Sequence, residues 1–278
     1  MIEHPTVTLR RARVIALAGL AIGLVMAPRT AHAQFEVDNF EVFLRTTAGT
    51  VSGTFLVRNV SDQAQTSQLR LGDWERRIDG TNVYRDSTGV LPGSCGGAVS
   101  AFPMTLRLAP QQSQVIRVTY TGPVRATSCW EIVYVGTAPQ PARSQSGAQL
   151  TVELRQGIKI YVEPSAARPE LKIDTLDVAR HVPPPATPAD TAGEDVLAIV
   201  SNPGTIQSRV RARIEYRTLA DSVVARSLID EFPILPGAQR MVRSRMPQLA
   251  NGHYVVLTIF DYGGSDLIAG QLQIDINR

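Results

Sequence analysis

The segment QLTVELRQGIKIYV, residues 149–162, is the clearest β-strand in the sequence. Apolar and polar residues alternate along it, as expected for a strand, because successive side chains point to opposite faces of a sheet. The apolar face carries Leu150, Val152, Leu154, Ile158, Ile160 and Val162. Globular strands usually have about five or six residues, so this strand is long. It belongs either to the core or to a sheet edge offered to a partner, and the alternation alone favours the core.

Shorter runs of the same kind recur about every ten residues, with turn-forming residues between them, which is typical of an all-β sandwich. The 18 prolines and 21 glycines argue against a helical bundle. We expect strands before this segment at 35–44, 53–59, 66–74, 104–108, 114–120 and 130–136. After it, we expect strands at 171–178, 196–201, 208–217, 223–229, 240–243, 253–261 and 268–276. Two sets of about seven strands predict two tandem sandwiches.

Two segments are candidates for the boundary between the sandwiches. The proline-rich segment VPPPATPADTAGED, residues 182–195, is typical of a stiff linker, whereas EPSAARPE, residues 163–170, lies between two strong strands. A boundary at 182–195 would leave the second unit one strand short. We therefore predict domains at 34–163 and 164–278, with 182–195 as a surface loop inside the second domain.

The first 33 residues have the features of a secretory signal peptide. Arg10, Arg11 and Arg13 precede a 13-residue apolar run at 14–26, and the small residues Ala31 and Ala33 mark a cleavage site after Ala33. The run is too short to span a membrane comfortably. Cleavage changes the formal charge from +3 to zero, with 24 basic and 24 acidic residues left. We therefore expect an exported chain that neither binds nucleic acid nor inserts into a membrane after cleavage.

Cys95 and Cys129 are the two cysteines, and an exported chain meets an oxidising environment. The alternatives to a disulfide are a nucleophilic cysteine, which needs a histidine, and a zinc site, which needs three or four ligands. After cleavage the histidines are His181 and His253, in unrelated contexts. We predict a structural disulfide.

Seven segments are informative when they are taken together along the chain. They are FLVRNVSDQAQTSQLRLGDW at 55–74, LRLAPQQSQVIRVTY at 106–120, CWEIVYVGTAP at 129–139, AQLTVELRQGIKIYVEPSAARPEL at 148–171, AIVSNPGTIQSRVRARIEY at 198–216, FPILPGAQRMV at 232–242 and IFDYGGSDLIAGQL at 259–272. Together these segments resemble the PapD-like family of periplasmic pilus chaperones. Their order and spacing carry the resemblance. It implies two immunoglobulin-like domains in a boomerang arrangement, located in the periplasm.

The resemblance also implies a function. Such a chaperone lends a strand to pilus-type subunits that lack one and passes them to an outer-membrane usher, without a cofactor or ATP. Main-chain bonds along the added strand give affinity, and alternate side chains give register. The donor residues at the matching positions are Leu150, Val152 and Leu154. This family match shifts the interpretation of the long strand from core to donated edge.

Lys159 matches the family's lysine that anchors the terminal carboxylate of the subunit, and Arg45 is the best candidate for the partner arginine. The match is incomplete at the hinge. Where the family has an arginine that pairs with the aspartate of the Asp-Tyr-Gly turn, this chain has Glu163, and two acids, Glu163 and Asp261, cannot form that pair. The resemblance therefore implies a divergent member.

The sequence contains no Gly-x-Ser-x-Gly elbow, phosphate-binding glycine loop or His-Glu-x-x-His motif, so we expect no catalytic residues and no metal site. We interpret Asp73, Glu75 and Asp79 as solvated charges at a strand end. The alternative to a chaperone is an exported structural or adhesive immunoglobulin-like protein that keeps the long strand for its own core.

Overall fold

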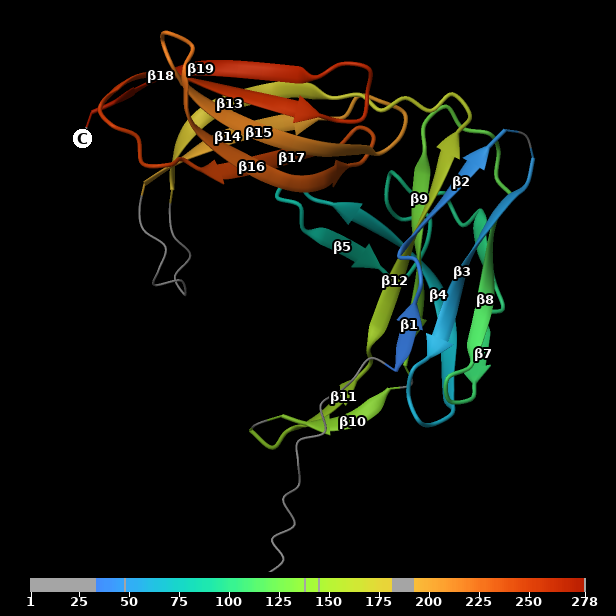
Figure 1. The fold of residues 1–278 in the computed structure, drawn as a ribbon. Coiled ribbons are helices and arrows are strands. Elements are labelled where there is room, and N and C mark those ends of the chain that lie inside the picture. Colours follow the sequence, from blue (N-terminus) through green and yellow to red (C-terminus); the bar gives the residue numbers. More distant parts are fainter. Residues whose placement is uncertain (1–33, 48, 138, 145, 182–192, 278) are drawn as a thin grey trace, which may run out of the picture. The chain divides into compact units, whose positions relative to one another are not determined.

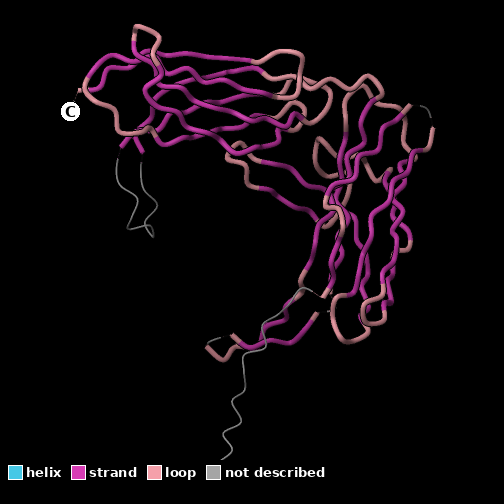
Figure 2. The backbone as a smooth tube through the Cα atoms, viewed as in Figure 1, coloured by secondary structure: helices cyan, strands magenta, loops and turns pink. Residues whose placement is uncertain are grey.

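The computed structural model describes residues 34–47, 49–137, 139–144, 146–181 and 193–277. Every regular element within these residues is a strand, as Figure 2 shows in magenta. The all-β prediction is confirmed. The signal peptide predicted at 1–33 lies outside the described residues.

The first group of strands runs from β1 to β12 (Figure 1). Its members are β1 (Phe35–Val37), β2 (Glu41–Thr46), β3 (Val51–Asn59), β4 (Gln65–Arg76), β5 (Asn82–Arg85), β6 (Val99–Phe102), β7 (Thr105–Leu108), β8 (Ser113–Tyr120), β9 (Cys129–Gly136), β10 (Gln140–Arg143), β11 (Gln149–Val152) and β12 (Arg155–Pro164). One sheet has the order β1-β3-β8-β6, and the other has the order β2-β12-β9-β4-β5 with β7 beside β4. β10 and β11 form a separate two-stranded sheet.

The two larger sheets of this group pack face to face as a sandwich. Their inward residues form one buried cluster, which includes Phe55 and Val57 from β3 and Val133 and Val135 from β9. The strand predicted at 35–44 is in fact two strands, because β1 pairs with β3 in one sheet while β2 pairs with β12 in the other. This change of sheet closes one side of the sandwich.

The second group runs from β13 to β19. Its members are β13 (Lys172–His181), β14 (Gly193–Ser201), β15 (Ser208–Thr218), β16 (Val223–Ile234), β17 (Gln239–Arg245), β18 (Gly252–Asp261) and β19 (Ile268–Ile276). The sheet β13-β14-β17 and the sheet β16-β15-β18-β19 enclose two further apolar clusters. In the part of the chain that the structure describes, no sheet contains strands from both groups.

β13 and β14 pair with each other, and His181 lies opposite Gly193. Most of the proline-rich segment predicted as a surface loop, residues 182–192, lies outside the described residues. Because the strands on either side of it share one sheet, it does not separate the two groups. The exact domain boundaries stay a prediction. Over the residues described, no helix is long and apolar enough to cross a membrane.

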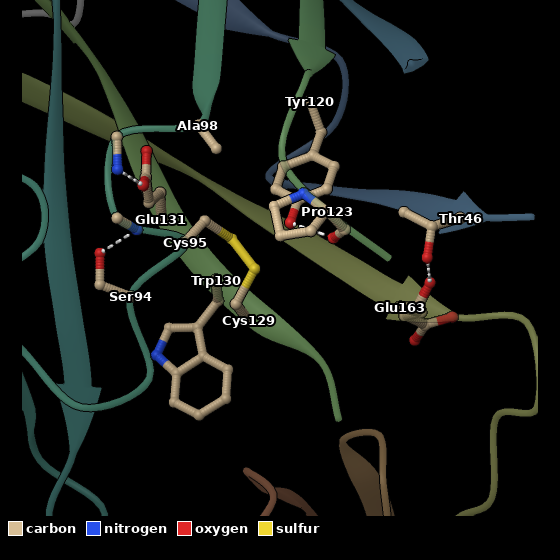
Figure 3. Close-up of a disulfide and its surroundings, with 12 residues drawn as sticks. Thr46, Ser94, Cys95, Ala98, Tyr120, Pro123, Cys129, Trp130, Glu131 and Glu163 are labelled. Atoms are coloured by element: carbon tan, nitrogen blue, oxygen red, sulfur yellow. Dashed lines mark hydrogen bonds between the residues drawn. A yellow bond between two sulfur atoms is a disulfide. The ribbon is translucent and has the colours of Figure 1, made fainter. Parts of the chain in front are cut away.

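The predicted disulfide between Cys95 and Cys129 is confirmed, and Figure 3 shows it joining the loop before β6 to the start of β9. The two Cα atoms are 5.0 Å apart, and the cysteines are separated by 34 positions in the sequence. Both cysteines are buried and belong to the core of the first sandwich.

Candidate functional site

The long strand predicted at 149–162 is divided into β11 and β12, and its apolar row is divided with it. In β12, Ile158 and Ile160 are 0% exposed. Before it, Leu150 is 48%, Val152 41% and Leu154 43% exposed. The core interpretation therefore holds for the second half of the row, and the first half lies open to solvent.

β11 pairs with β10 in antiparallel register, from Gln140 opposite Val152 to Arg143 opposite Gln149. In Figure 1 this hairpin projects beyond the ends of β9 and β12. Its base is held by Thr137, whose backbone N–H donates to the Leu154 carbonyl at 2.9 Å. A two-stranded hairpin is marginally stable on its own. In this one the apolar side chains of Leu150 and Val152 stay exposed, so a partner can reach them.

β12 has an open backbone edge next to the hairpin. It pairs with β9 from Arg155 to Val162, but it pairs with β2 only from Lys159 to Pro164. No described strand pairs with residues 155–158 on the β2 side. Such an edge presents N–H and C=O groups that a strand from another chain can use.

Lys159 stands where this open edge ends. Its ammonium nitrogen lies 4.5 Å from the centre of the Trp74 ring, a cation–π contact, and Trp74 is completely buried. Burial lowers the pKa of Lys159 below its ordinary value, and the charge of Arg76 lowers it further, while Glu41 opposes both. Within the described residues, Lys159 forms no ion pair.

The surroundings of Lys159 contain more positive than negative charge. The Arg76 guanidinium carbon lies 5.7 Å from the same Trp74 ring centre. Glu41, the register partner of Lys159, is already engaged, because it pairs with Arg209 and accepts the Tyr161 hydroxyl at 3.3 Å. A half-buried cation without its own anion favours binding of a carboxylate from elsewhere.

Arg45 does not lie beside Lys159. It stands opposite Glu163, four positions farther along the β2–β12 pairing, and its Nη2 lies 3.5 Å from Glu163 Oε2. The Arg45 side chain is 67% exposed, whereas that of Glu163 is 8% exposed. Arg45 is thus the cation that compensates Glu163, which Figure 3 shows with its carbonyl bonded to Thr46.

Sequence reasoning missed three participants in the Lys159 site: Trp74, Arg76 and Arg209. It also misjudged Asp73, which is not solvated but 0% exposed. The alternation of Asp73, Trp74 and Glu75 contained a usable signal, because a strand that buries Trp74 on one face can bury Asp73 on the other.

Comparisons with protein-family models and with curated proteins found no match. Among solved structures, the class 5 fimbriae chaperone CfaA is 15% identical, with 85% of this chain and 98% of that chain covered and a TM-score of 0.48. The CsuC–CsuE chaperone–tip adhesion subunit complex of Acinetobacter baumannii gives 10% identity, coverage of 86% and 98%, and a TM-score of 0.47. The complex of Salmonella enterica SafA pilin with the SafB chaperone gives 15% sequence identity, with 87% of this chain and 98% of that chain covered and a TM-score of 0.45.

Proposed function

We propose that this protein is a periplasmic chaperone that binds exported, pilus-type subunits by lending them a strand. The observation that carries the proposal is the exposed apolar row of Leu150, Val152 and Leu154, which leads into an open edge of β12. The row ends at Lys159, for which the described residues supply no ion-pair partner. The three features lie along one stretch of chain, in the order that a strand-shaped ligand needs. A protein that kept this strand for its own core would bury the row.

The expected client is a β-sandwich subunit that lacks one strand and so leaves an apolar groove open. Its groove strand pairs with the edge at residues 155–158 and with β11, and the three apolar side chains enter the groove. Because these side chains are about half exposed in the free protein, covering them contributes on the order of 2 to 4 kcal/mol before ordering costs.

Lys159 receives the terminal carboxylate of the client in this scheme. A charge-assisted bond contributes roughly 1.5 to 3 kcal/mol, and it fixes which residue of the client lies opposite which residue of the donor. Arg45 stays a proposed second anchor, to be tested separately because it is engaged with Glu163. Export by the segment at 1–33 and transfer of the client to an outer-membrane usher complete the proposal.

The test is co-expression with a candidate pilus-type subunit that carries a secretory signal peptide, followed by co-purification. We expect Lys159→Met and Val152→Asp each to reduce recovery of the subunit at least tenfold. The matched control is Lys172→Met, because Lys172 is an exposed lysine of β13 whose partner is Asp174. Arg45→Ala measures the second anchor. Unchanged recovery with both Lys159→Met and Val152→Asp would reject the chaperone assignment.

A further inference from the structure

A loop in the first sandwich, residues 86–98, is held by two buried carboxyl groups and the disulfide. Asp73 Oδ2 accepts the backbone N–H groups of Val90 at 2.6 Å and Leu91 at 2.9 Å. Glu131 Oε1 accepts the N–H of Gly97 at 2.9 Å, close to the disulfide in Figure 3. The loop is therefore tied near its middle and near its end.

Both carboxyl groups are 0% exposed, and each has one oxygen left over. Asp73 Oδ1 and Glu131 Oε2 are buried and have no hydrogen-bond partner among the residues that the structure describes. Neither residue forms an ion pair within the described part of the chain. Burying an ionised carboxylate without a cation costs free energy, and repulsion between two such carboxylates costs more. A pair of this kind therefore retains a proton.

The groups around Glu131 indicate which residue holds that proton. From β4 it faces Asp73, from the loop it faces backbone N–H groups, and its register partner on β12 is the apolar Ile160. Burial, and to a smaller extent the charge of Asp73, raise the pKa of Glu131 from 4.5 to about 7, against the opposing effect of the Gly97 N–H. Asp73 Oδ2 accepts two backbone N–H groups, whereas Glu131 Oε1 accepts one.

We infer that Glu131 holds a proton while the 86–98 loop is closed, and that Glu131 and Asp73 together form a pH-operated latch on this loop. The closed loop keeps this proton on the buried Glu131. Opening the loop admits water, lets Glu131 ionise and releases the proton. Rising pH therefore favours opening. The proposal does not depend on the chaperone assignment, since it concerns the closure of the loop alone.

The latch also contacts the structure beneath the candidate site. Gly93 in the loop lies flat against the Trp130 ring, since a Cβ at Gly93 would fall 1.9 Å from a ring carbon. The Gly93 carbonyl accepts the Trp130 backbone N–H at 2.9 Å, and the Trp130 indole N–H donates to the Trp74 carbonyl at 2.8 Å. Trp74 supports Lys159. Loop opening thus perturbs the ring on which Lys159 rests.

The proposal is tested by amide hydrogen exchange and by carboxyl-carbon NMR between pH 5 and pH 8. The opening constant that governs exchange at Gly97 should rise about tenfold per pH unit up to the pKa of Glu131 and level off above it, because one proton leaves with each opening. The Glu131 carboxyl signal should titrate near pH 7, within about one unit. Glu131→Gln, which keeps the acceptor oxygen but cannot ionise, should make the opening constant independent of pH.

Glu153→Gln is the matched control, because Glu153 pairs with Arg155 at the surface of the same sandwich and lies outside the latch. It should keep the wild-type pH dependence. A Glu131 signal that titrates below pH 5 overturns the proposal, and so does a wild-type opening constant that is flat between pH 5 and pH 7. The Glu131 titration and the opening constant are both measured on the wild-type protein. They therefore test the proposal even if the glutamine variant fails to fold.

Discussion

Replacing Leu150, Val152 and Leu154 by serine, one at a time, should change the stability of the free protein far less than replacing a buried residue of the same row, and the three changes together should strongly weaken client binding. Each of these side chains is already 41% to 48% exposed, so the free protein loses only part of its burial energy. That loss is at most about 1 kcal/mol per residue, and surface substitutions usually cost less, within about 0.5 kcal/mol. Ile160→Ala, in the same row but 0% exposed, should cost about 2 to 5 kcal/mol.

The assay is urea unfolding followed by tryptophan fluorescence, which reports on the buried Trp74 and Trp130. Binding of the co-expressed subunit is then measured with the same variants. A loss of about 2 to 4 kcal/mol in binding free energy corresponds to a roughly 30- to 1,000-fold larger dissociation constant. Destabilisation by each single serine variant equal to that of Ile160→Ala would show that the hairpin is part of the core. A stable triple variant that still binds the subunit with unchanged affinity would refute strand donation.

Three other measurements follow from the first sandwich. Removing the disulfide by changing Cys95 and Cys129 to alanine should lower the free energy of unfolding by about 4 kcal/mol, measured with urea, and a loss below about 1 kcal/mol would contradict a structural role. The pKa of Glu131 is raised from 4.5 to about 7, so protonated Glu131 stabilises the fold fully below pH 4.5. This stabilisation is lost as the pH rises to about 7, and the free energy of unfolding falls by up to roughly 3 kcal/mol. Glu131→Gln should remove this pH dependence, measured by thermal unfolding at a series of pH values. Gly93→Ala should cost about 1 to 3 kcal/mol and alter the near-ultraviolet circular dichroism of Trp130, since the added Cβ meets the ring; an unchanged spectrum would contradict that packing.

The alternation of side chains sufficed to predict the long strands, because their burial follows directly from the period of two. It did not predict β5, β6 or β10, which have four residues each. β10 contains a proline and no apolar pattern, and it is a strand because β11 pairs with it. Such short strands depend on partners that a local pattern does not contain.

The same limit explains why Lys159 was predicted and its neighbours were not. Residues 41, 43 and 45 of β2 share one face, so alternation treats them as equivalent positions beside β12. The parallel register places Glu41 opposite Lys159 and Arg45 opposite Glu163. Arg76 and Arg209 reach the site from β4 and β15, through pairings that only the folded chain reveals.

The division of one apolar row between two strands bears on how such patterns should be interpreted. Alternation of apolar and polar side chains indicates that one face of a strand is buried in the working protein. It does not indicate which molecule covers that face. For Ile158 and Ile160 the cover is supplied by the sandwich itself, because β12 lies between β2 and β9. For Leu150 and Val152 the described part of the chain supplies only β10, and the side chains stay exposed. An apolar row on one face of the chain that loses its cover halfway, beside an open backbone edge and before a lysine with no ion-pair partner among the described residues, therefore favours a cover that comes from another chain.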